Sequence, residues 1–144
     1  MADDADPDAE AVARADAALA ALTADYLRWV ARDIDTLKAA VAGLAAAGSG
    51  QWADSAQRIV LIAHDIKGQG TTFGYPLMTR LGQAVCEAAR AAKEPCDGVL
   101  ARLDALVAAM SEVLASRLGD DSGPQARDLL SRAGLHPPGL WAKD

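Results

Sequence analysis

The sequence predicts an all-α protein: an antiparallel four-helix bundle with an extra N-terminal helix segment and a short C-terminal extension. Hydrophobic residues make up 51% of the 144 residues, and many are Ala, a strong helix former. Aromatic residues are only 4%, and β-branched residues are few, so strand formers are scarce. Four stretches carry apolar residues three or four positions apart, with short breaks between them. Amphipathic helices joined by short loops bury their apolar stripes against one another in a bundle.

The first helix is expected from about Asp8 to Ala47, where the sequence Gly-Ser-Gly at 48–50 predicts a loop. Thr23 is a residue type that can cap a new helix, which would leave a short leading helix before it. The acidic stretch at 1–8 is predicted to be a disordered tail. The apolar positions of this helix are Leu19, Leu22, Tyr26, Trp29, Val30, Leu37, Val41 and Leu44.

The second helix is expected to begin near Gln51 or Trp52, and Gly70, Gly74 and Pro76 are expected to end it and turn the chain. One continuous stripe with steps of three and four marks its buried face. The stripe consists of Trp52, Ala56, Ile59, Ala63, Ile66, Gly70 and Phe73.

Two further helices are expected from about Pro76 to Ala92 and from about Asp97 to Leu118, with a break at Glu94-Pro95 between them. We therefore assign residues 1–118 to the bundle and residues 119–144 to the C-terminal extension. The extension contains a possible short helix over 124–133, which either covers one end of the bundle or is loose. The inner faces of the two helices are Leu77, Leu81, Val85, Ala88 and Ala92, and Leu100, Leu103, Val107, Met110, Leu114 and Leu118.

Composition excludes several classes of function. The net charge is −6 and no block of Lys and Arg occurs, so a nucleic acid partner is not expected. The two cysteines, Cys86 and Cys96, form no CxxC pair and no cluster with His, so no metal site is expected. No signal segment opens the chain and no apolar run of membrane-spanning length occurs. We therefore expect a cytoplasmic protein with reduced thiols and no contact with a membrane.

The segment that carries chemistry is residues 63–74. Successive helical residues turn by about 100°. Lys67 therefore lies about 60° to one side of His64 and Gly68 about 40° to the other, both one turn further on. His64 lies off the buried stripe through Ala63 and Ile66, so we expect it to reach solvent. A histidine, a cation and a residue without a side chain then form one small outward patch.

This patch suits phosphoryl transfer. A neutral imidazole nitrogen is a competent nucleophile, and an unperturbed histidine is largely neutral near pH 7. The Lys67 ammonium can neutralise charge on the transferred phosphoryl oxygens. Gly68 would leave the approach to His64 open for a phosphorylated aspartate of another protein.

A docking surface for that partner is expected around the histidine. Val60 and Leu61, one turn before His64, form either an apolar rim or part of the core, with Leu61 expected to be partly buried. Gln69 and Thr71, beyond Gly68, are assigned to the same surface, although Gln69 could also simply face solvent.

No carboxylate cluster surrounds His64, so we expect no metal ligands and no cofactor of the protein's own. No Gly-rich ATP loop occurs either, so the protein is not expected to be an enzyme that phosphorylates itself. It would receive and pass on a phosphoryl group, with Mg²⁺ supplied by the partner's aspartate pocket. His136 has no partner pattern, and Asp65 is expected to be a solvated charge.

The segment resembles the histidine phosphotransfer (HPt) family, whose hallmark is His-x-x-Lys-Gly followed by a Gly six residues later. This chain has His64, Lys67, Gly68 and Gly74. The local sequence around Lys67 and Thr72-Phe73-Gly74-Tyr75 is similar to the phosphorylated domain of chemotaxis histidine kinases. Many members have Ser or Ala after the Lys-Gly pair, where this chain has Gln69 and Gly70.

The resemblance covers about residues 23–118, including the four-helix plan. It implies that His64 is phosphorylated, that Lys67 stabilises the phosphoryl group, that Gly68 provides clearance, and that Gly74 is the structural turn. The implied partners are response-regulator receiver domains and a sensor or hybrid histidine kinase. No kinase domains are apparent, so a free-standing carrier, monomeric, is expected.

Two alternatives compete with the phosphocarrier. One is an HPt-shaped binding module that sequesters or inhibits a kinase or receiver without carrying phosphate. The presence of both His64 and Lys67 argues against that role. The other is a metal-dependent enzyme built in a helical bundle, for which the paired carboxylates and Glu-x-x-His patterns are missing.

Overall fold

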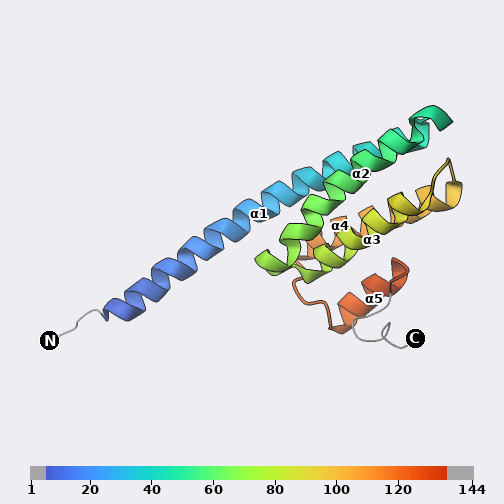
Figure 1. Ribbon diagram of the computed structural model, residues 1–144. Coiled ribbons are helices and arrows are strands. Elements are labelled where there is room, and N and C mark those ends of the chain that lie inside the picture. The colour runs from blue at the N-terminus through green and yellow to red at the C-terminus, as the bar shows by residue number, and fades with distance from the viewer. Residues whose placement is uncertain (1–5, 136–144) are drawn as a thin grey trace.

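The computed structural model describes residues 6–135, and this range contains five α-helices, one 3₁₀ turn and no strand (Figure 1). The prediction of an all-α fold is therefore confirmed. The elements are α1 (Pro7–Ala46), α2 (Ser49–Gly70), η1 (Thr71–Phe73), α3 (Pro76–Ala91), α4 (Asp97–Ser116) and α5 (Pro124–Arg132).

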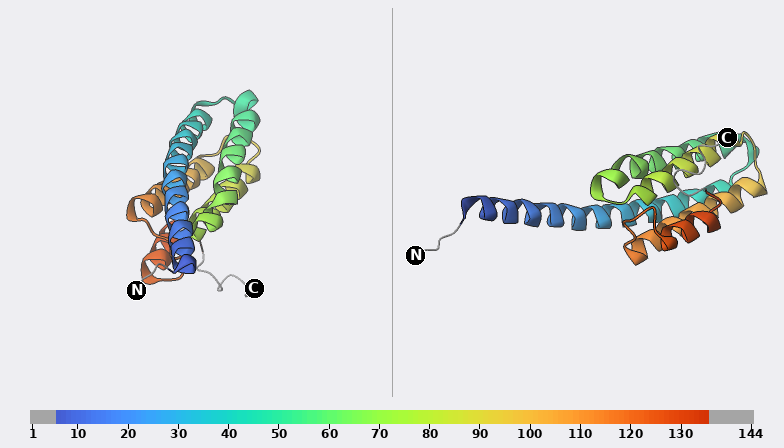
Figure 2. Two further views of the ribbon diagram at one scale, coloured as in Figure 1. Left: turned by 90° about the vertical axis from the view of Figure 1, so that its left-hand side faces the viewer. Right: turned by 90° about the horizontal axis from the view of Figure 1, so that it is seen from below.

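The first four helices pack around a shared core. Helix α2 lies between α1 and α3, and α4 contacts both α3 and α1, which closes the arrangement. Figure 2 shows these four helices aligned along one direction. The largest fully buried side chains come from all four helices, and burial of this apolar surface is the main force that holds them together. They include Tyr26, Leu37, Leu44, Trp52, Ile59, Ile66, Leu77, Met78, Leu81, Leu103, Leu106 and Met110.

Helix α1 is continuous, so the predicted break at Thr23 is wrong. The Thr23 hydroxyl donates to the carbonyl oxygen of Leu19 at 3.0 Å, one turn back, and does not cap a new helix. The helix begins instead at Pro7, where the Asp6 side chain accepts a 3.0 Å hydrogen bond from the Asp8 amide. Residues 6–8, predicted to be part of a disordered tail, therefore start the helix, and residues 1–5 lie outside the described range.

The N-terminal part of α1 extends beyond the other helices (Figure 1; Figure 2). Every residue from Asp6 to Leu22 is exposed. Leu19, Leu22 and Trp29 were expected to contribute to the bundle's apolar seam, and all three are exposed. Leu19 and Leu22 are exposed because α1 is longer than its neighbours, so its first turns have no helix beside them. Trp29 lies within the span of the bundle, between the buried Tyr26 and Val30, and is exposed because it lies on the outer side of α1.

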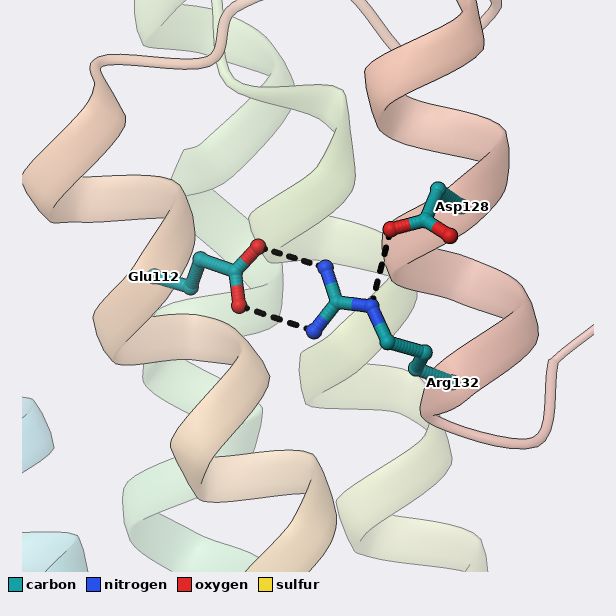
Figure 3. A network of polar contacts seen from close by, with 3 residues as sticks. All are labelled: Glu112, Asp128 and Arg132. Atoms are coloured by element: carbon teal, nitrogen blue, oxygen red, sulfur yellow. Dashed lines mark hydrogen bonds and ion pairs between the residues drawn. The ribbon is translucent and has the colours of Figure 1, made fainter.

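The C-terminal helix α5 packs against the bundle and is not loose. Leu129 and Leu130 are buried in the common core, and the Arg102 guanidinium donates to the carbonyl oxygen of Ala133 at 3.3 Å. On the surface, Arg132 binds both carboxylate oxygens of Glu112 on α4, at 3.0 and 2.7 Å (Figure 3). It also pairs with Asp128 at 2.8 Å. The Arg132–Glu112 contact joins α5 to α4, whereas the Arg132–Asp128 pair lies within α5.

Candidate functional site

The site lies on the outward face of α2. Ala63 and Ile66 are buried, whereas His64 between them in sequence is exposed. The α-helix produces this separation, because adjacent positions on it point about 100° apart. An exposed imidazole on a regular helix is accessible to another macromolecule.

Lys67 and Gly68 lie one turn beyond His64 and differ in their surroundings. Lys67 is half-buried, whereas Gly68 is exposed. A Cβ atom placed on Gly68 would meet no atom within 4 Å, apart from the helix's own adjacent backbone. The space beside the imidazole is therefore open, and no atom of residues 6–135 packs against position 68 closely enough to require a glycine there.

Lys67 is held where α2 and α3 approach closely. A Cβ atom on Gly82 of α3 would lie 3.0 Å from the N, Cα and Cβ atoms of Lys67. Such a distance is tighter than ordinary van der Waals contact, so a larger residue at position 82 would push the two helices apart. Because Gly82 has no side chain, the backbone of Lys67 can lie directly against α3.

A threonine on α3 fastens the end of α2. The Thr79 hydroxyl donates to the carbonyl oxygen of Lys67 at 3.0 Å and accepts from the Thr71 amide at 2.9 Å. The Thr71 hydroxyl also donates to the Thr79 hydroxyl oxygen, at 3.0 Å. One hydroxyl group can donate once and accept twice, so this cluster uses its full capacity. It joins the turn that carries Lys67 directly to α3.

Gly74 makes the turn that follows the histidine-bearing helix. Its φ of 86° lies in the left-handed region, which favours glycine, and its amide donates to the Thr71 carbonyl oxygen at 3.1 Å. The Tyr75 amide donates to the Gly70 carbonyl oxygen at 2.8 Å and completes the turn. The backbone conformation matches the structural role assigned to Gly74.

Aromatic side chains hold this turn against α1. The rings of Tyr26 and Phe73 stack with centroids 4.7 Å apart, and Tyr75 lies 5.8 Å from Tyr26. Burial raises the pKa of the Tyr26 hydroxyl to about 12. The ring contacts fix the turn after α2 from the α1 side, as Thr79 does from α3.

The residues assigned to the docking surface do not all lie on it. Val60 is only 4% exposed and belongs to the core, so of its two expected placements the core is correct, and its assignment to the docking surface is wrong. Leu61 is 60% exposed, contrary to the expected partial burial. Adjacent positions on a helix point about 100° apart, so the buried stripe of α2 can include position 60 and leave position 61 exposed.

Gln69 and Thr71 are both exposed. Gln69 lies about 140° around α2 from His64, on a different flank of the helix. Thr71 has its amide and hydroxyl engaged with Thr79. The structure thus brings His64, Lys67, Gly68 and Leu61 to one side of α2, places Gln69 on a different flank, and gives Thr71 a structural contact.

The charges around His64 are asymmetric. Lys67 lies toward α3, whereas Asp65 lies toward α1 and close to Asp33. Burial raises the pKa of Asp33 above its usual range, and the neighbouring negative charge of Asp65 raises it further. A partner that approaches His64 therefore meets positive charge on one side and negative charge on the other.

The described part of the chain contains no group of three or more His, Cys, Asp or Glu residues placed to hold a metal ion. None of the helices within residues 6–135 is long and apolar enough to cross a membrane. His136 lies outside the described residues.

Sequence reasoning missed Thr79 and Gly82, which position the site from α3. Gly82 left a signal, because a glycine inside an otherwise apolar helical pattern often marks a close backbone approach. The sequence gives no signal for the role of Thr79, since a threonine near the start of a helix has many possible hydrogen-bond partners.

The chain was compared with protein-family models, with curated proteins and with solved structures, and none of the three comparisons gave a match.

Proposed function

We propose that this protein is a histidine-containing phosphotransfer protein of a two-component phosphorelay. It would carry a phosphoryl group on His64 between the receiver aspartates of response regulators, or between a hybrid kinase and a regulator. The observation that carries the proposal is the exposed imidazole of His64, with open space over Gly68 on one side and the half-buried Lys67 on the other. The packing of α1–α4 supports it, because the HPt resemblance implies a four-helix bundle.

The glycine at position 68 supports an external partner. A glycine inside a helix costs about 1 kcal/mol relative to alanine. Gly70 and Gly82 offset this cost by allowing close packing, since a Cβ at either position would meet backbone atoms at 3.0 Å or less. At Gly68, no neighbouring element within the described residues offers such close packing. We infer that its space is filled by a group from another protein during transfer.

The proposed step is an in-line displacement at phosphorus. A ring nitrogen of His64 forms the new N–P bond, while the bond between phosphorus and the aspartyl oxygen of the partner breaks. The partner's carboxylate leaves with the electron pair, and the proton on the other ring nitrogen is released to solvent. Lys67 neutralises charge on the equatorial oxygens. Bound Mg²⁺, supplied by the partner's acidic pocket, would neutralise charge from the opposite side.

Leu61 is the proposed anchor for docking. It is a large apolar side chain exposed one turn before His64, and such residues gain free energy when a partner covers them. A receiver domain or kinase that presents an apolar patch beside its phosphorylated aspartate would cover Leu61 as it reaches His64.

The test is phosphotransfer from a phosphorylated receiver domain. The purified full chain should take the label from a cognate receiver, and a His64→Gln variant should take none. Because His64 is exposed, the variant should keep the wild-type helix content by circular dichroism. A His64→Gln protein that still binds the receiver and still supports signalling would instead indicate a binding module that sequesters its partner.

A further inference from the structure

The apolar face of α1 continues past the end of the bundle. Val12, Leu19 and Tyr26 follow one another at intervals of seven residues, which places them on one line along the helix. Tyr26 is buried in the core, whereas Val12 and Leu19 are each 58% exposed. The face that α1 buries within the bundle is therefore uncovered over its first turns.

Further side chains widen this uncovered face. Leu22 and Trp29 are exposed along one edge of the line. Along the other edge, Leu19, Thr23, Leu27 and Arg117 line a shallow groove between α1 and the end of α4. The row of large exposed apolar residues favours a packing partner for this segment.

The charges along the segment indicate the orientation of that partner. The first turn is acidic, with Asp6, Asp8 and Glu10. The other end carries Arg117, which caps α4 and makes no ion pair within residues 6–135. The acidic tip and Arg117 therefore lie at opposite ends of the segment, with Asp16 in the same groove as Arg117.

We propose that the uncovered face of α1 packs against the same face of a second copy, with the two helices antiparallel. In this arrangement Val12 of each copy lies against Leu19 of the other, and the acidic tip of each lies beside Arg117 of the other. The contact is two-fold symmetric, so both copies use the same surface. A parallel arrangement would place the two acidic tips together. The protein is then a dimer, in place of the monomer expected from the sequence.

The first test is sedimentation of the full chain at micromolar concentrations. The wild type should sediment as a dimer, and Leu19→Glu should sediment as a monomer with unchanged helix content in the bundle, because Leu19 makes no core contact. Leu61→Glu is the matched control, since it places the same charge on an exposed leucine outside this face, and it should remain a dimer. A monomeric wild type, or a dimeric Leu19→Glu protein, would overturn the proposal.

The second test fixes the orientation with single cysteines in a Cys96→Ser background, where the remaining Cys86 is buried. In the antiparallel pair, position 15 lies next to its own copy, so Ala15→Cys should form an intermolecular disulfide. Position 12 lies on the same face but roughly 10 Å from its copy along the helix axis, so Val12→Cys should not, whereas in a parallel pair it would meet its own copy. Crosslinking through position 12, or through neither position, would contradict the antiparallel pair.

Discussion

The two sides of α2 use glycine for opposite reasons. Toward α3, Gly70 and its neighbours are packed so closely that a Cβ atom would lie 2.8 Å from the Thr79 amide nitrogen and the Tyr75 carbonyl oxygen. On the outward side, Gly68 faces open space. The first glycine is required by the fold, whereas nothing within the described structure requires the second. Gly43 of α1 and Gly50 of α2 are equally open, so openness alone does not single out Gly68. What distinguishes Gly68 is its place one turn beyond the exposed His64.

The largest expected effect on stability is at Gly70. Gly70→Ala should destabilise the protein by about 1–3 kcal/mol, because the new methyl group overlaps backbone atoms that cannot move without opening the α2–α3 contact. Urea denaturation followed by circular dichroism would measure the change. A Gly70→Ala protein as stable as the wild type would show that this side of α2 is not closely packed.

The Lys67 charge is expected to matter for transfer more than for folding. Lys67→Met keeps the length and the packed stem of the side chain but removes the ammonium group. Phosphotransfer to His64 should slow roughly tenfold, a loss of about 1.4 kcal/mol of transition-state stabilisation. Lys67→Arg keeps the positive charge and should retain much of the rate. Stopped-flow measurement with one phosphorylated receiver would compare the variants, and equal rates for Met and the wild type would remove Lys67 from the proposed mechanism.

Gly68→Ala is the counterpart of Gly70→Ala and should have the opposite sign. Alanine should stabilise α2 by about 0.5–1 kcal/mol, since nothing obstructs the methyl group. The same substitution should slow phosphotransfer, because the methyl group occupies the approach to His64. Gly43→Ala on α1 is the control: its Cβ also meets nothing within 4 Å, so it should stabilise the protein and leave transfer unchanged. A Gly68→Ala protein with full transfer activity would contradict the assigned clearance role.

The smallest expected effect concerns the surface network that fastens α5. The hydrogen bonds from Arg132 lower the pKa of Glu112, so the network stabilises the fold above the ordinary Glu pKa. This stability is lost as the pH falls through the lowered pKa of Glu112. Arg132→Gln should therefore be slightly less stable than the wild type at pH 7 and equal to it at pH 2, as measured by urea denaturation. A difference that persists at pH 2 would indicate packing and not the ion pair.

Periodicity and glycine placement were enough to predict the helices, their order and the outward position of His64. Those features depend on local geometry. The helical spacing of Ala63, His64 and Ile66 determines which side of α2 faces the core. The burial of Val60 and the exposure of Leu61 could not be predicted. Both are aliphatic residues at the edge of the stripe, and only the position of the neighbouring helices decides which is covered.

Contacts between segments that are distant in the sequence could not be predicted either. Thr79 bonds to Lys67 across twelve residues, and Gly82 sets the distance between α2 and α3. The continuous course of α1 through Thr23 was mispredicted because a threonine hydroxyl can cap a helix or bond back to the preceding turn with similar ease. Tertiary packing resolves such choices.

The most direct measurement of the central claim is the position and chemistry of the phosphoryl group itself. After incubation with a phosphorylated receiver, phosphorus NMR and mass spectrometry of the intact chain should find one phosphoryl group, on His64, labile in acid and stable in alkali. A phosphoryl group on any other residue, or an unmodified chain with every receiver and kinase of its cell, would contradict the account.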